Sequence, residues 1–166
     1  MKTLIIYFTM SGRTKKTAEA IGSALTDHEV SFLALQLTGK FVEKIKKLDK
    51  FENNDYSAVE SELSTLDASK YDLIIIGMPT YGNFPPKVFN EILRRMDNLN
   101  GKMIILFNTA RFSGGKSLDY MKEQIKEIGG KVIDHFKFRK LFWIGTKKAI
   151  QFGKRVNENV KSIEEF

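Results

Sequence analysis

LIIYFTMSGRT, residues 4–14, is the stretch that decides the fold of this chain. Its five consecutive apolar residues, Leu4–Phe8, are typical of a parallel strand that is covered on both faces. The apolar run ends at the turn TMSGRT, and a helical pattern follows. Unpaired backbone N–H groups and the helix dipole make such a strand-to-helix turn a natural anion site. Taken alone, the turn is equally compatible with an ordinary connection whose Ser and Thr merely cap the helix.

Length and composition favour a single soluble domain spanning residues 1–166, with 42% hydrophobic and 28% charged residues. No apolar run reaches the roughly 18 residues of a membrane span, and the run that ends at Phe8 is too short for a signal peptide. We therefore expect a cytoplasmic protein. The chain has no cysteine, which excludes disulfides, thiolate catalysis and cysteine-based zinc sites. Its two histidines, His28 and His135, lack metal-ligand spacing, so no metal site is expected.

The net charge of +7 is concentrated between residues 131 and 155, where eight Lys or Arg stand against one acid, Asp134. Such a stretch could attract an acidic partner or nucleic acid. Nucleic acid is disfavoured because basic residues do not alternate with aromatic ones. We favour a solvated helix face together with lysines that protect an edge strand from pairing.

Strand and helix patterns alternate along the chain. Strands are predicted over residues 4–8, 30–37, 72–77, 102–108 and 132–138. One helix is predicted over residues 13–25, and a second is opened by Pro85-Pro86. A third helix ends near Ile128, and the final helix has Ile163 on its inner face. This order predicts a three-layer α/β fold, a doubly wound parallel sheet of five strands in the order 2-1-3-4-5.

Residues 38–70 form the least regular segment, inserted between the second and third strands. Phe41, Ile45 and Leu48 fit one helical stripe, and Val59 and Leu63 begin another that continues to residue 66. The pattern is compatible with two short helices or with one helix and a mobile loop.

In this kind of sheet, ligands bind beyond the carboxyl ends of the strands at the topological switch point. The loops after the first, third and fourth strands therefore converge on one site. In this sequence they read TMSGRT (residues 9–14), MPTYGNF (78–84) and TARFSGG (109–115), all rich in glycine and hydroxyl groups.

These loops resemble those of the flavodoxin family. TMSGRT is similar to the flavodoxin phosphate loop, roughly T-x-S/T-G-x-T. GMPTYG, residues 77–82, looks like the second flavodoxin loop, where an aromatic residue before a glycine stacks on the flavin. Phe112 stands about where a second aromatic residue flanks the ring. The resemblance covers the whole chain in element order and implies a flavodoxin-like fold with FMN as its cofactor.

The resemblance also implies which residues bind FMN. The first loop would hold the phosphate through hydroxyls and backbone N–H groups: Thr9, Met10, Ser11, Gly12, Arg13 and Thr14. The second would stack Tyr81 on the isoalloxazine and line its edge: Pro79, Thr80, Tyr81, Gly82, Asn83 and Phe84. The third would offer backbone groups to the pyrimidine side and cover a face with Phe112: Asn108, Thr109, Ala110, Arg111, Phe112 and Gly114. Gly82 would permit the peptide rotation that brings a carbonyl to the N5–H of a reduced ring.

Two departures from the family pattern concern charge. Typical flavodoxins are acidic, whereas this chain has a pI near 9.5. Arg13 stands where the phosphate loop usually has an uncharged residue, and Arg111 lies in the third loop. Positive charge near the ring would favour the anionic reduced flavin, so we expect a less negative potential for the second electron. An acidic redox partner would suit this charge.

The loops contain no paired acid and base, so no catalytic residue is assigned. This favours a low-potential electron carrier over a small NAD(P)H-dependent FMN or quinone oxidoreductase. We expect the protein to be a monomer or a homodimer. Two classes stay open outside the flavoproteins. Residues 110–117, ARFSGGKS, nearly match the nucleotide P-loop G-x-x-x-x-G-K-S/T, although Ala110 replaces its first glycine and Asp134 is the one later strand acid for magnesium. A cofactor-free binding module that uses the basic stretch is the other alternative.

Overall fold

The computed structural model describes residues 1–96, 99–139 and 145–164. Its five strands all pair in parallel, in the order β2-β1-β3-β4-β5, as predicted. The strands are β1 (Lys2–Thr9), β2 (Glu29–Gln36), β3 (Leu73–Pro79), β4 (Met103–Ala110) and β5 (Lys131–Arg139). The α-helices are α1 (Arg13–Ser23), α2 (Phe41–Lys50), α3 (Glu60–Leu63), α4 (Val88–Arg95), α5 (Ser117–Glu127) and α6 (Thr146–Glu164).

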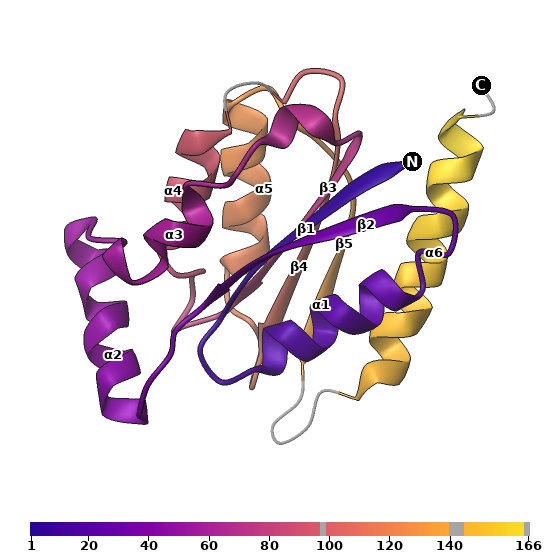
Figure 1. Ribbon diagram of the computed structural model, residues 1–166. Helices are drawn as coiled ribbons and strands as arrows, with labels where there is room; N and C mark the ends of the chain where they lie inside the picture. Colours follow the sequence, from indigo (N-terminus) through magenta and orange to yellow (C-terminus); the bar gives the residue numbers. More distant parts are fainter. Residues whose placement is uncertain (97–98, 140–144, 165–166) are drawn as a thin grey trace.

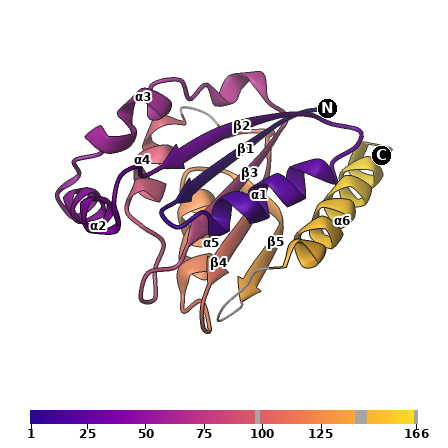
Figure 2. The same cartoon turned by 60° about the horizontal axis from the view of Figure 1, so that its bottom comes forward.

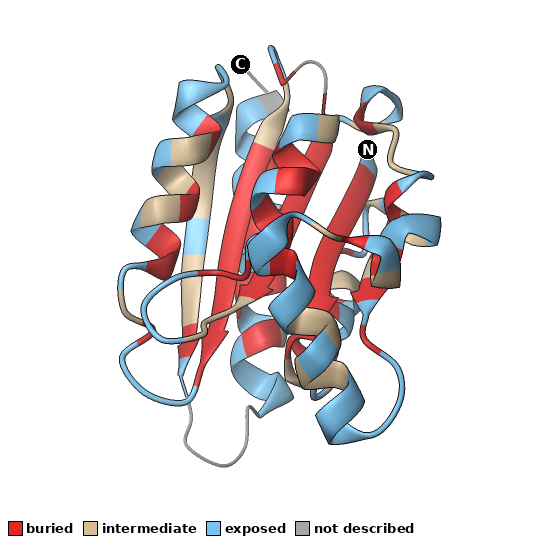
Figure 3. Cartoon of the chain, turned by 90° about the vertical axis from the view of Figure 1, so that its left-hand side faces the viewer, coloured by how far each residue is buried: buried red, intermediate tan, exposed pale blue. Residues whose placement is uncertain are grey.

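The sheet is the middle of three layers (Figure 1). Helices α1 and α6 cover one face, and α3, α4 and α5 cover the other. Successive residues of β1 divide between the two cores: Leu4, Ile6 and Phe8 belong to one, Ile5 and Tyr7 to the other. This explains why the strand is apolar without alternation. Figure 3 shows the result, with central strands buried along most of their length and exposed outer helix faces.

Glycine lets helices α1 and α6 approach closely. A Cβ at Gly153 of α6 would lie 2.6 Å from the carbonyl oxygen of Ile21 in α1. Inside the sheet, Gly77 leaves room for the ring of Phe107 on the neighbouring strand. A larger side chain at Gly153 would push α1 and α6 apart, and one at Gly77 would displace the Phe107 ring.

The segment between β2 and β3 contains α2, α3 and three 3₁₀ turns: η1 (Phe51–Asn53), η2 (Ser57–Val59) and η3 (Ala68–Lys70). Val59 and Leu63 are buried in the core, as the second helical stripe predicts. The first stripe is buried only in part, because Ile45 and Leu48 are half-buried and Leu48 packs against the core, whereas Phe41 is 69% exposed. Phe41 is therefore the member of this stripe that does not pack against the core.

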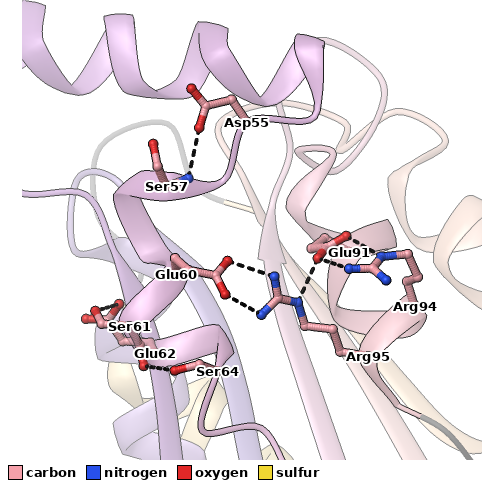
Figure 4. A network of polar contacts seen from close by, with 9 residues as sticks. All are labelled: Asp55, Ser57, Glu60, Ser61, Glu62, Ser64, Glu91, Arg94 and Arg95. Atoms are coloured by element: carbon pink, nitrogen blue, oxygen red, sulfur yellow. Dashed lines mark hydrogen bonds and ion pairs between the residues drawn. The ribbon is translucent and has the colours of Figure 1, made fainter.

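An ion-pair network fixes α3 against α4 (Figure 4). Glu91 is only 8% exposed and accepts hydrogen bonds from Arg94 and Arg95 of its own helix. Arg95 also donates two hydrogen bonds, of 2.9 and 2.7 Å, to the carboxylate of Glu60 in α3. These guanidinium groups lower the pKa of Glu60 and of Glu91. The network stabilises the inserted segment on the side of the molecule away from α1.

Two helix details differ from the sequence predictions. Pro85 and Pro86 precede α4, which begins at Val88, and the Pro86 carbonyl accepts the N–H of Phe89 at 3.0 Å in the turn that leads into the helix. Ile163 is 49% exposed, since the buried stripe of α6 ends at Val160.

The basic stretch is mostly a solvated surface, as expected. Lys147, Lys148 and Lys154 are exposed on α6, whereas Arg155 forms two hydrogen bonds with Asp134 and lies over the ring of Phe152. Lys140 lies outside the described residues. Within the described part of the chain, no helix is long and apolar enough to cross a membrane.

Candidate functional site

The loops after β1, β3 and β4 meet at one edge of the sheet, which Figure 2 turns toward the viewer. Between them lies a cavity of about 560 Å³, a size typical of small-molecule sites. It is lined by Thr9, Met10, Ser11, Arg13, Thr14, Phe41, Pro79, Thr80, Tyr81, Gly82, Thr109, Ala110, Arg111, Phe112, Ser113 and Gly114. The structure thus brings all three predicted loops together around one space.

Four predicted site residues do not line this cavity, and two unpredicted ones do. Gly12 forms the start of α1, and Asn83 occupies the turn that the third loop packs against. Phe84 faces a second cavity, and Asn108 is fully buried behind Thr80. The additional lining residues are Phe41 and Ser113.

The first loop has the geometry of an anion site. Gly12 is the N-cap of α1 with a φ of 86°, and it carries no side chain that could cap the first turn of amides. The Gly12 N–H donates to Thr9 Oγ1 at 2.9 Å, so one of the predicted phosphate donors already has an acceptor. The buried hydroxyl of Thr14 pairs with Thr109 Oγ1 at 2.8 Å, which ties the first loop to the third. Ser11 is exposed at the tip.

The second loop is a two-residue turn that presents Tyr81. The N–H of Tyr81 donates to the Phe84 carbonyl at 3.0 Å, and the reverse bond measures 3.3 Å. Gly82 has a φ of 63° at the first central position of this turn, a conformation that glycine adopts without penalty. Burial raises the pKa of the Tyr81 hydroxyl to about 12, so it keeps its proton at neutral pH.

The third loop packs directly on the second. The Lys116 N–H donates to the carbonyl of Asn83 at 2.9 Å, and a Cβ at Gly115 would lie 2.6 Å from the Asn83 Cα. Behind them, Asn108 Nδ2 donates to Thr80 Oγ1 at 2.9 Å. Glycine at position 115 is therefore needed for the two loops to touch.

The sequence model of the flavodoxin family matches residues 2–137. The chain belongs to the flavodoxin family. No curated protein matches the sequence. Among solved structures, a flavodoxin from the Archaea shares 23% identity over 97% of this chain and 99% of its own, with a TM-score of 0.61. A flavoprotein from Lactobacillus acidophilus, solved in complex with FMN, is 26% identical over 82% of this chain and 92% of its own, with a TM-score of 0.60. A flavone reductase is 17% identical over 99% of this chain and 64% of its own, with a TM-score of 0.67.

Phe41 is the lining residue of this flavodoxin-family site that lies outside the three predicted loops, and the sequence interpretation misses it. It begins α2 just beyond the end of β2, at the same edge of the sheet as the three loops, and it lines the cavity. Its position, at the start of a helix that follows the end of a strand, is a sequence feature that could have indicated a site residue. The helical stripe that Phe41 shares with Ile45 does not reveal this role, because the same spacing fits a residue that packs against the core equally well.

A second cavity of about 540 Å³ adjoins the first through Tyr81. Its lining includes Leu48, Phe84, Pro85 and Tyr120, and the rings of Phe84 and Tyr120 meet edge to face at 5.8 Å. The first cavity carries hydroxyls, a helix N-terminus and arginines, whereas this one is walled mainly by rings and prolines.

The nucleotide P-loop alternative fits the geometry poorly. Lys116 is exposed, and the backbone of its loop is engaged with Asn83. Asp134, the acid expected for magnesium, is bound by Arg155 at 2.8 and 2.9 Å. Among the described residues, no group of three or more His, Cys, Asp or Glu could hold a metal ion.

Proposed function

We propose that this protein binds FMN in the cavity between the three loops and works as an electron carrier. The observation that carries the proposal is the lining itself, which joins an anion site at one end to aromatic walls at the other. The Lactobacillus acidophilus relative that contains FMN supports the cofactor assignment.

The donor set suits both ends of FMN. At the phosphate end stand the N-terminus of α1, the exposed Ser11 hydroxyl and the positive charge of Arg13. At the ring end stand the aromatic side chains of Tyr81 and Phe112, and aromatic rings bind flat π-systems well. Bound FMN would supply the one- and two-electron chemistry, and the protein would supply binding, orientation and electrostatics.

The carrier function is supported by what the lining contains. No Asp, Glu, His or Lys is among the residues that line the cavity, and burial raises the pKa of the lining Tyr81 to about 12, which makes it a poor proton donor or acceptor at neutral pH. Phe112 is 74% exposed, so the ring end opens to solvent, where a partner protein can approach. Arg13 and Arg111 give the lining of the cavity a positive charge, which favours an acidic redox partner.

A small NAD(P)H-dependent FMN or quinone oxidoreductase is the second candidate, and the second cavity beside Tyr81 favours it. That space could admit another small molecule next to the ring end. Stopped-flow mixing of the FMN-loaded protein with NADPH separates the candidates. A carrier stays oxidised unless a partner reductase is added, whereas an oxidoreductase loses its flavin absorbance at once.

The cofactor proposal is tested by the visible spectrum of the purified protein before and after addition of FMN. We expect flavin absorbance that stays with the protein through gel filtration, with the flavin fluorescence altered by binding. Protein that remains colourless after incubation with FMN would overturn the proposal and favour a binding module without a flavin. Potentiometric titration of the loaded protein then measures the effect of the arginines, and we expect the second electron to enter at a less negative potential than in acidic flavodoxins.

A further inference from the structure

Helix α2 contacts the phosphate loop through one lysine. The Nζ of Lys44 donates a hydrogen bond of 3.0 Å to the backbone carbonyl of Met10, a lining residue of the first cavity. Lys44 is half-buried, whereas the neighbouring Lys46 is exposed. The flavodoxin loop motif does not include α2, so this contact is visible only in the folded chain.

The contact fixes the orientation of a peptide group in the loop. The described backbone has no cis peptide bond, and in a trans peptide the C=O and N–H point in opposite directions. When Lys44 holds the Met10 carbonyl, the N–H of Ser11 is therefore directed away from Lys44. Lys44 thus limits the rotation of one of the amides assigned to the phosphate.

The charge of Lys44 is not neutralised inside the described part of the chain. Lys44 forms no ion pair with a described residue, and the carboxylate of Glu43 is engaged with the Lys40 N–H at 2.8 Å. An ammonium group has three donors, and the Met10 carbonyl takes one of them. Lys44 does not line the cavity, so this half-buried cation would act on a bound phosphate through its positive potential and through the peptide that it holds.

We propose that Lys44 makes the site prefer FMN to riboflavin. It does so at the phosphate end of the ligand, by orienting the Met10–Ser11 peptide and by adding a positive charge beside the loop. This inference rests on the proposed FMN site. Lys44 acts as a positioning and specificity residue from a segment outside the three loops.

The test is the ratio of the dissociation constants for riboflavin and FMN, since the two ligands differ only in the phosphate. In Lys44→Met we expect FMN to bind about tenfold more weakly, because the Met10–Ser11 peptide is no longer held and the charge beside the loop is lost, with riboflavin binding changed by less than about twofold. Lys44→Arg, which keeps charge and donors, should restore most of the ratio. Lys44→Gln answers the same question should the methionine variant fold poorly.

Two lysines on the same helix provide matched controls. Lys46→Met removes an exposed charge, and Lys47→Met removes a bond of 2.9 Å to the Thr38 carbonyl, which lies outside the phosphate loop. Both should leave the ratio unchanged. If Lys44→Met weakens both ligands equally, or neither, the inference is wrong. If the wild-type protein binds neither flavin, the proposed function fails instead, so the two failures are distinguishable.

Discussion

The phosphate end and the ring end of the cavity are built differently. At the phosphate end, buried hydroxyls are paired with other parts of the chain: Thr9 with Gly12, and Thr14 with Thr109. At the ring end the loop backbones are tied together, but the ring of Phe112 is mostly exposed. One end is fixed before any ligand arrives, and the other leaves its aromatic groups free to face solvent.

This difference suits an electron carrier. A phosphate site pre-organised by hydrogen bonds can supply affinity, because little ordering is left for the moment of binding. An open ring end can supply access, because in the proposed carrier electrons would pass to a partner at that edge. Comparing FMN with riboflavin separates the two ends, since changes at the ring end should affect both ligands and changes at the phosphate end mainly FMN.

The largest effect on flavin affinity is expected from Gly115→Ala, which disturbs the backbone contact between the second and third loops at the ring end. The new Cβ would lie 2.6 Å from the Asn83 Cα, at a φ of 50° that disfavours side chains, so the third loop must shift. A cost of about 2 kcal/mol for the binding-competent arrangement corresponds to roughly 30-fold weaker binding of both flavins. Isothermal titration with each ligand measures this.

Gly101→Ala is the control for Gly115→Ala. Gly101 has a φ of 74°, a Cβ added there would have no atom within 4 Å, and the residue lies at the opposite end of β4 from the site. The variant should lose stability by a similar backbone strain but keep its flavin affinity. Equal loss of affinity in both variants would show that general destabilisation, not loop contact, controls binding.

A smaller and more selective effect is expected from Thr14→Val at the phosphate end. The substitution keeps the shape but removes the hydroxyl that pairs with Thr109, leaving a buried group without its partner at a cost of about 1–3 kcal/mol. We expect FMN affinity to fall about tenfold and riboflavin affinity to fall less. Thr17→Val is the matched control, since Thr17 is equally buried in α1 but bonds the Arg13 carbonyl. A larger loss for riboflavin than for FMN in Thr14→Val would contradict the assignment of this end.

The fold and the three loops can be predicted because they depend on local patterns. Apolar runs of strand length alternate with helical stripes, and parallel connections leave few sheet orders to choose from. Tyr81 and Thr14 can be placed at the site because each follows a strand end at the switch point.

The remaining site features depend on contacts that sequence spacing does not encode. The stripe with Ile45 and Leu48 does not single out Phe41 as a site residue, because an amphipathic pattern does not tell which of its members pack against the protein. Lys44 touches Met10 from 34 positions away, and no motif joins them. Phe84 lies in a predicted loop, but the turn that pairs it with Tyr81 directs its ring to the second cavity.

The titration of Tyr81 measures how far the ring end excludes water from the Tyr81 hydroxyl. Burial raises its pKa from 10.0 to about 12, so between these values the folded protein holds a proton that the unfolded chain releases. The free energy of unfolding should therefore fall as pH rises from 10 toward 12, because the native state binds more protons there. Tyr81→Phe should show a shallower fall in denaturant midpoints over the same window, since the other tyrosines and the lysines titrate equally in both proteins. Identical curves would mean that Tyr81 is solvated.

The smallest expected effect belongs to Phe41→Ala, and it decides whether α2 is part of the ring end at all. Phe41 is 69% exposed yet lines the cavity, whereas Val42 is 64% exposed and does not. If the Phe41 ring covers bound flavin, its removal should weaken FMN and riboflavin alike by about two- to threefold, the low end of an aromatic contact. Val42→Ala removes a comparably exposed apolar group from the same helical turn and should change neither. A loss confined to FMN in Phe41→Ala would instead place α2 at the phosphate end alone, and the comparison between a fixed end and an open end would then rest on Tyr81 and Phe112.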